Sequence, residues 1–385
     1  MYSFSAFRCA TAAAVVVPMI VSAAALAAPL YDGATATQCI PFANHQAVSF
    51  TDAPRLNISV GPVRGYTSVQ MDTGSVGVAL SAGKIPDFEA LKARSDSAPG
   101  TQYLSSSKML WAGTWVRTTV TLYDRAGKPV AVALVPVLGV ERAGHCPSYQ
   151  TDGTICPDLA PAVKGDIFYM GVGFGQEADF QPQGTPDKNV LLNLVRMRDQ
   201  PVDPTSFNPG YIIGRQGIQV GLTAANTAGF RFAKLSPYQQ YSGDWEPPMG
   251  CLTVNPAENG SSCLKAKVLV DTGIPQSYMT VPPSTKLTTV KAPDASEPKR
   301  QIDVLAPGNS VSVSLPETPE FIATDAFTIG GNTPVEPKQV IPSITDKHPP
   351  FINTGRHFLR QFQFLYDARQ GYLGIKDQPN PCGEL

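Results

Sequence analysis

Two copies of the tripeptide Asp-Thr-Gly are the residues of this chain whose types and spacing are best suited to chemistry. One copy occupies residues 72–74 and the other residues 271–273, so the two aspartates lie 199 positions apart. Each follows a strand-like apolar pattern, alternating in "SVQM" before Asp72 and continuous in "VLV" before Asp271. One Asp-Thr-Gly alone is most simply a turn that ends a strand. Its recurrence in the same surroundings indicates a paired site.

Two carboxylates within hydrogen-bonding distance of each other favour acid–base hydrolysis. Ionisation of both carboxyl groups is unfavourable, so the pair holds one proton over a broad acidic pH range. The charged carboxylate can take a proton from water while the neutral one donates to a substrate carbonyl oxygen, without a covalent intermediate. In each triplet the glycine lets backbone N–H groups approach the carboxylate, and the threonine hydroxyl can reach backbone across the junction. This chemistry requires no cofactor.

Short β-strands are the elements that must position these triplets. Apolar runs of strand length, separated by Gly, Pro and Asp, recur along the chain. The second half repeats the plan of the first, because in both halves a strand leads into an Asp-Thr-Gly triplet. We therefore predict an all-β fold with strands at 56–60, 66–71, 114–123, 130–140, 211–222, 230–235, 265–270, 310–315, 361–367 and 371–376.

Three other segments have distinct patterns. Residues 187–200 carry apolar residues at helical spacing and stop at Pro201, which predicts a helix. Residues 286–303 are polar and contain proline, which predicts an exposed loop. Residues 222–229 have weak periodicity and lie between the two halves of the chain, so we expect a hinge there.

The composition agrees with a loop-rich β protein. The chain has 385 residues, enough for two domains, and a net charge of −1, which gives no basis for a nucleic-acid partner. Charged residues make up only 16% of the chain and there are 36 prolines, which favours strands and loops over long helices.

The start of the chain is typical of a secretory signal peptide. Residues 1–28 contain one cationic residue, Arg8, then an apolar run, and small residues up to Ala28 that fit a signal-peptidase site. An uncleaved membrane anchor is the alternative, but Pro18 interrupts the run and its richness in alanine makes a weak spanning helix. We therefore expect a secreted or periplasmic mature protein without stable membrane insertion.

The cysteines also indicate an oxidising compartment. Of the seven cysteines, Cys9 leaves with the signal peptide, and the remaining six form an even set. Metal binding is the alternative, but no cysteines have Cys-x-x-Cys spacing and the four histidines show no recurring interval, so we predict no metal site. Short intervening loops favour pairing of Cys146 with Cys156 and of Cys251 with Cys263, which leaves Cys39 for Cys382.

Longer segments around the triplets resemble the pepsin-type, two-lobed aspartic peptidases. Residues 58–80, "ISVGPVRGYTSVQMDTGSVGVAL", are similar to the opening hairpin and first active-site loop of that family, and residues 263–282, "CLKAKVLVDTGIPQSYMTVP", to the second loop. Residues 168–175, "FYMGVGFG", resemble the element that crosses the first loop, and residues 355–376, "GRHFLRQFQFLYDARQGYLGIK", the closing segment. The similarity extends over most of the mature chain.

The resemblance implies a bilobal pepsin-like fold and a set of site residues. The N-terminal lobe would comprise residues 29–226 and the C-terminal lobe residues 227–385, with a substrate cleft between them. Asp72 and Asp271 would be the catalytic pair, one from each lobe. The supporting residues would be Thr73 and Thr272, whose reciprocal hydrogen bonds lock the loops together, Gly74 and Gly273, Ser75 beside the outer oxygen of Asp72, and Gly171 and Gly355 in the crossing elements.

The family also folds a hairpin over the cleft, with a tyrosine near its tip. Residues 102–115, "QYLSSSKMLWAGTW", occupy that place, and Tyr103 is the flap candidate ahead of Trp111 and Trp115. A surface aromatic on a strand is the alternative role for Tyr103. The implied activity is that of a monomeric acid endopeptidase that cleaves extended peptides or unfolded proteins.

Three departures from the family pattern support a second hypothesis. Ile274 stands where Ser or Thr is usual, so Asp271 loses a hydroxyl partner, and Asn353 and Thr354 replace an apolar pair. The interval between the signal peptide and the first triplet leaves no room for an inhibitory prosegment. The alternative is therefore a catalytically inactive pepsin-fold protein that binds a peptide or protein partner.

Overall fold

The computed structural model describes most of the chain that follows the signal-peptide-like segment. The predicted signal peptide at 1–28 and Cys382 lie outside the described residues. Within the described ranges, no helix is long and apolar enough to cross a membrane. The described residues are 29–44, 49–176, 181, 183–239, 243–260, 263–294, 299–317 and 320–377.

The fold is all-β, as predicted, and its largest sheet comes from the first half of the chain. This N-terminal sheet has ten strands, and the segments that lead into and out of the first triplet lie near its centre. Its strands are β2 (Arg55–Val60), β3 (Thr67–Asp72), β4 (Val76–Ser81), β5 (Ala98–Leu104), β6 (Met109–Tyr123), β7 (Pro129–His145), β8 (Ala160–Pro161), β9 (Phe168–Val172), β10 (Leu194–Met197) and β11 (Gln200–Pro201).

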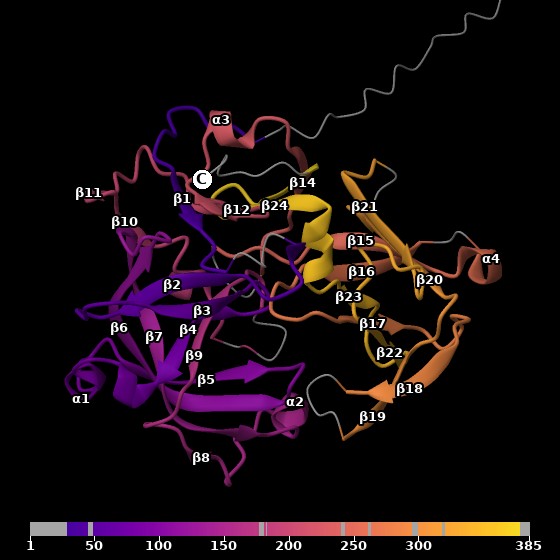
Figure 1. Ribbon diagram of the computed structural model, residues 1–385, viewed down its shortest axis with the longest axis horizontal. Helices are drawn as coiled ribbons and strands as arrows, with labels where there is room; N and C mark the ends of the chain where they lie inside the picture. The colour runs from indigo at the N-terminus through magenta and orange to yellow at the C-terminus, as the bar shows by residue number, and fades with distance from the viewer. Residues whose placement is uncertain are drawn as a thin grey trace, which may run out of the picture.

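A second sheet and a separate hairpin come from the second half of the chain. Figure 1 shows them in orange, on the opposite side of the molecule from the indigo and magenta N-terminal sheet. The C-terminal sheet comprises β15 (Met249–Val254), β16 (Leu264–Leu269), β17 (Ser277–Val281), β20 (Ser310–Leu315), β21 (Ala323–Thr328), β22 (Val340–Ile344) and β23 (Phe351–Asn353), and the hairpin comprises β18 (Thr289–Pro293) and β19 (Gln301–Leu305).

A third sheet joins strands from both halves of the chain. Its central pairing is antiparallel, between β12 and β24, and the labels β1, β12, β24 and β14 mark it along the top of Figure 1. We call it the connecting sheet. Its strands are β1 (Gln38–Pro41), β12 (Gly210–Ile213), β13 (Gly217–Val220), β14 (Arg231–Lys234), β24 (Phe362–Asp367) and β25 (Tyr372–Asp377).

The helices of the described residues are all short. Each has three to five residues, so none supplies a long packing surface. The α-helices are α1 (Phe88–Lys92), α2 (Tyr149–Asp152), α3 (Ala224–Thr227) and α4 (Pro256–Asn259), and the 3-10 turns are η2 (Ala82–Lys84), η3 (Pro186–Lys188) and η4 (Arg356–Arg360).

Each half of the chain repeats one arrangement of strands around its triplet. In the first half, β9 lies between β3, to which it is parallel, and β4, to which it is antiparallel. In the second half, β23 lies in the same way between β16 and β17. In both halves, therefore, the strand before the triplet and the strand after it are separated by a third strand from elsewhere in the sequence. We call β9 and β23 the crossing strands.

The connecting sheet packs behind the first crossing strand. One main apolar core contains buried residues of all three sheets, as expected when alternate residues of each strand face inward. The rings of Phe174 and Tyr366 stack with centroids 3.9 Å apart, and the Tyr211 hydroxyl donates to the Val172 carbonyl at 2.6 Å. Val172, at the end of β9, is thus bonded to β12, and Phe174, just after β9, packs against β24.

Two of the predicted disulfide pairings are confirmed. Cys146 and Cys156 are bonded with their Cα atoms 5.7 Å apart, and Cys251 and Cys263 with theirs 5.0 Å apart. The remaining predicted pair joins Cys39, on β1, to a cysteine beyond the described residues, so it stays a prediction. The two bonded pairs agree with an oxidising, extracellular setting.

The predicted helix at 187–200 is wrong. The segment contains the end of η3, then a turn, then the extended residues of β10 and the first residue of β11. The side chain of Asn189 donates to the carbonyls of Val172 and Gly173 at 2.8 and 3.1 Å. These side-chain bonds hold an irregular, buried turn, in which the apolar residues enter the core without a helical backbone.

Two further segments differ from their predictions. Residues 286–303, predicted as a loop, contain β18 and the start of β19, and the mostly exposed faces of these strands explain their polar composition. Residues 222–229 contain α3, which begins with a capping box between Thr223 and Asn226. The predicted boundary after residue 226 falls inside this helix, and the division into two lobes stays a prediction.

Candidate functional site

The two Asp-Thr-Gly triplets lie side by side and are joined by reciprocal hydrogen bonds. The backbone N–H of Thr73 donates to the Thr272 hydroxyl, and the N–H of Thr272 to the Thr73 hydroxyl, both at 3.0 Å. Each hydroxyl in turn donates across the junction, Thr73 to the Val270 carbonyl at 2.5 Å and Thr272 to the Met71 carbonyl at 2.8 Å. Only a hydroxyl both accepts and donates in this way, which explains threonine at both positions.

The glycines of the triplets lie against the opposite aspartates. A Cβ atom at Gly74 would lie 2.6 Å from Asp271 Cγ, and a Cβ atom at Gly273 would collide with Asp72 Oδ1. The two glycine N–H groups donate to the aspartates of their own triplets, at 2.9 Å to Asp72 Oδ1 and 2.7 Å to Asp271 Oδ1. Close packing of the two carboxylates therefore requires a residue without a side chain at both positions.

Two hydroxyl groups hold the second oxygen of Asp72. Ser75 donates to Asp72 Oδ2 at 2.6 Å, as the resemblance implies, and the Tyr169 hydroxyl donates to the same oxygen. Tyr169 lies on the crossing strand β9, and burial, followed by the charge of Asp72, raises its pKa well above the usual value. Tyr169 therefore remains a protonated donor.

An amide holds the corresponding oxygen of Asp271. Asn353 Nδ2, on the crossing strand β23, donates to Asp271 Oδ2 at 2.7 Å. Gly355 N–H donates to Asn353 Oδ1 at 2.9 Å, which fixes the orientation of the amide. Asp271 thus has a side-chain donor although Ile274 offers no hydroxyl.

The two carboxylates are buried and interact directly. Asp72 is 4% exposed and Asp271 is 7% exposed. Burial raises the pKa of Asp271 well above its usual value, and the charge of Asp72 and a hydrogen bond with it raise the pKa further. The Asn353 amide and the Gly273 N–H oppose this shift. One proton is therefore retained by the pair, on Asp271, well above the pH at which an exposed aspartate ionises.

The segment predicted as the flap forms a hairpin, and its role over a cleft, with Tyr103 near the tip, stays a prediction. β5 and β6 form the hairpin, and Tyr103 is fully buried in a cluster where its ring lies 5.2 Å from that of Tyr149. Trp111 instead packs edge-on against Tyr169, with ring centroids 5.3 Å apart. Gln102 pairs with Trp111 across the hairpin, so these two residues share a face. Successive residues of a strand face opposite sides, so Tyr103 lies on the other face from Trp111.

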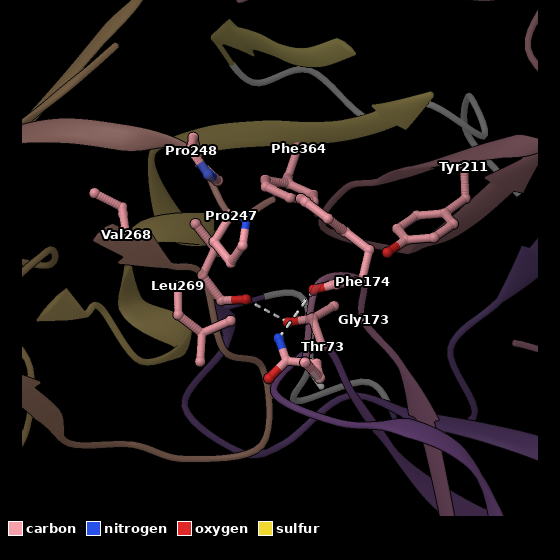
Figure 2. Close-up of a pocket in the computed structure, with 11 residues that line it drawn as sticks. Thr73, Gly173, Phe174, Tyr211, Pro247, Pro248, Val268, Leu269 and Phe364 are labelled. Atoms are coloured by element: carbon pink, nitrogen blue, oxygen red, sulfur yellow. Dashed lines mark hydrogen bonds between the residues drawn. The ribbon is translucent and has the colours of Figure 1, made fainter. Parts of the chain in front are cut away.

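A small cavity lies between the first triplet and the connecting sheet. Its volume is about 10 Å³, room for about one water molecule. Figure 2 shows Thr73 and Leu269 at one end of it and Tyr211 and Phe364 at the other. This cavity is a gap in the packing behind the triplets and is too small for a substrate.

Tyr169 and Asn353 are the two site residues that the sequence analysis did not assign. The resemblance treats residues 168–175 only as the element that crosses the first loop, and Asn353 only as a departure from an apolar pair, so neither the phenol nor the amide is given a role. The signal that could have identified them is their shared position, two residues before the crossing glycines Gly171 and Gly355. The remaining predicted site residues of the two triplets, with Ser75, are brought together as described above.

Comparisons with known proteins add no assignment. No protein-family model matches the chain, and no curated protein matches it. Among the described residues, no group of three or more His, Cys, Asp or Glu side chains is arranged to hold a metal ion. The interpretation of the site therefore depends on its geometry and on the motifs that resemble the aspartic peptidases.

Proposed function

We propose that the chain is an exported, two-lobed endopeptidase of the pepsin type, active at acidic pH. The observation that carries this proposal is the carboxylate pair, in which two aspartates from distant triplets lie buried against each other. The crossing strands and the reciprocal threonine bonds support it, because they place the pair symmetrically at the junction of the two halves. Two bonded cysteine pairs agree with export.

In the proposed mechanism the two aspartates have different roles. Asp72 accepts hydrogen bonds from Gly74, Ser75 and Tyr169, which stabilise its charged form, so it serves as the base. Asp271 retains the shared proton and serves as the acid. Asp72 removes a proton from a water molecule, the water oxygen bonds to the peptide carbonyl carbon, and Asp271 protonates the carbonyl oxygen.

The second stage breaks the peptide bond. The tetrahedral intermediate collapses when Asp271 takes back a hydroxyl proton and the proton on Asp72 passes to the leaving nitrogen. The products are a carboxylic acid and an amine, and the pair regains its single proton. The substrate would be an extended peptide or an unfolded protein, because only such a chain can present its backbone to both carboxylates.

Digestion of casein between about pH 2.5 and 7 tests the proposal. We expect cleavage in the acidic part of this range and inhibition by a statine-containing peptide, which resembles the hydrated intermediate. Asp72→Asn and Asp271→Asn should each abolish cleavage while the protein stays folded. Asp166→Asn is the matched control, because Asp166 is an exposed aspartate whose side chain is 96% accessible. Full cleavage by either variant of the pair would refute the mechanism.

A binding protein with this fold is the second candidate. The observation that favours it is Ile274, which leaves Asp271 with one donor fewer than Asp72 has. A purified wild-type protein that binds the statine peptide but cleaves no substrate at any pH would support this second function. Calorimetric titration with the same peptide, beside the casein assay, distinguishes the two.

A further inference from the structure

We propose that Asn353 is a positioning residue that replaces the missing hydroxyl at position 274 and, together with Tyr169, keeps the shared proton between the two carboxylates. Each of these residues lies on a crossing strand and donates to the Oδ2 atom of the nearest aspartate, Asn353 to Asp271 and Tyr169 to Asp72. The effect on catalysis rests on the proposed peptidase function. The effect on the titration of Asp271 does not depend on that function.

The strand register of the first half sets the position of Tyr169. On β3, Tyr169 pairs with Gln70, two residues before Asp72. On β4, it pairs with Ala79, seven residues after Asp72. Tyr169 therefore lies between the strands that enter and leave the first triplet, where its hydroxyl can reach Asp72.

The register of the second half places Asn353 at the equivalent position. Asn353 pairs with Leu269, two residues before Asp271, and with Tyr278, seven residues after it. These are the same offsets that Tyr169 has in the first half. The equivalence comes from the backbone pairing alone, so it does not depend on the side-chain chemistry that it explains.

The surroundings of Asn353 leave its amide a single orientation. Its Oδ1 atom accepts from Gly355 N–H, so Nδ2 faces Asp271, and Ser277 donates to the Asn353 carbonyl at 2.6 Å. Asn353 is only 8% exposed. An amide nitrogen donates and cannot accept, so Asp271 Oδ2 is held as an acceptor. Oδ1 is held as an acceptor in the same way by the Gly273 N–H.

Loss of the amide would make the charged form of Asp271 less favourable. A hydrogen bond to a carboxylate favours ionisation, so removing it raises the pKa of the acid. The other titratable or charged groups that act on Asp271 would remain in a variant at position 353. They are Asp72 on β3, Tyr169 on β9, Tyr278 on β17 and Arg356 on η4.

The test follows the titration of Asp271 by carboxyl carbon NMR in the aspartate-labelled full chain, with Asp271→Asn used to assign its signal. In Asn353→Leu, which introduces an apolar residue of similar size, we expect the midpoint to rise by about one pKa unit or more, a tenfold change in the dissociation constant. In Asn353→Leu with Ile274→Thr, the new hydroxyl should bring the midpoint back towards the wild-type value. Asn309→Leu is the matched control, because Asn309 is a buried, hydrogen-bonded asparagine on a distant loop.

An isosteric variant keeps the inference testable if Asn353→Leu does not fold. Asn353→Asp preserves the Gly355 contact but replaces the donor with a second acid, so the midpoint of Asp271 should rise there as well. An Asp271 titration that is unchanged in the folded variants would overturn the inference. Absence of casein cleavage by the wild-type protein would instead refute the proposed function, since the NMR titration requires no activity. In an active enzyme, the alkaline limb of the kcat/KM profile should move with the Asp271 midpoint, because activity requires Asp271 to be protonated.

Discussion

Substitution of Thr272 by valine is the sharpest test of the junction between the triplets. Valine has nearly the shape of threonine, so no cavity forms, but the bonds to Thr73 N–H and to the Met71 carbonyl are lost. Both groups would stay buried and lose these partners, because Met71 is 0% exposed and Thr73 is 4% exposed. Each unpaired group costs about 1–3 kcal/mol, so we expect the free energy of unfolding to fall by about 2–6 kcal/mol. Typical domains have only about 5–15 kcal/mol in total.

Urea unfolding followed by tryptophan fluorescence measures this loss. Thr272→Ser keeps the hydroxyl and should recover most of the stability. Thr328→Val is the matched control on an exposed strand position, and its effect should stay within about 0.5 kcal/mol. A Thr272→Val protein as stable as the control would refute the claim that the hydroxyl bonds hold the two halves together.

Two other predictions concern stability. Replacing both Cys146 and Cys156 with alanine should lower the free energy of unfolding by about 2–3 kcal/mol, because the bond closes a loop with a sequence separation of 10, and non-reducing urea titration checks this. The raised pKa of Asp271 gives stability that is complete below its ordinary pKa of 3.8 and is lost as the pH rises through the raised value. Urea midpoints of the wild type should therefore fall over that range relative to those of Asp271→Asn, which has no proton to lose, and parallel curves would contradict the assignment.

The fold class and the triplets could be predicted from the sequence because their signals are local. Alternation of apolar residues identified strands close to β2 and β3, and turn residues marked where they end. The helix prediction at 187–200 is wrong because the apolar spacing of this segment suits a helix as well as it suits the observed buried turn. What decides it is the Asn189 side chain, whose partners Val172 and Gly173 are distant in sequence.

The donors on the crossing strands could not be predicted in the same way. Their function depends on strand register, which joins residues 70 and 169 in one half and residues 269 and 353 in the other. A polar residue in an otherwise apolar strand has no evident role until its hydrogen-bond partner is known. The burial of Tyr103 could not be predicted for the related reason that only the packing of the hairpin decides which face of β5 turns inward.

In the proposed mechanism, the unequal donor sets favour a proton on Asp271. Asp72 accepts from three groups in the first half of the chain, whereas Asp271 accepts from one backbone N–H and the Asn353 amide. A hydroxyl at position 274 would add a third donor to Asp271 and favour its charged form. Ile274 prevents this, while Asn353 keeps Asp271 from becoming too weak an acid to give up its proton. From the sequence alone, Ile274 only removes a hydroxyl partner from Asp271. In the proposed mechanism, this removal is what separates the acid from the base.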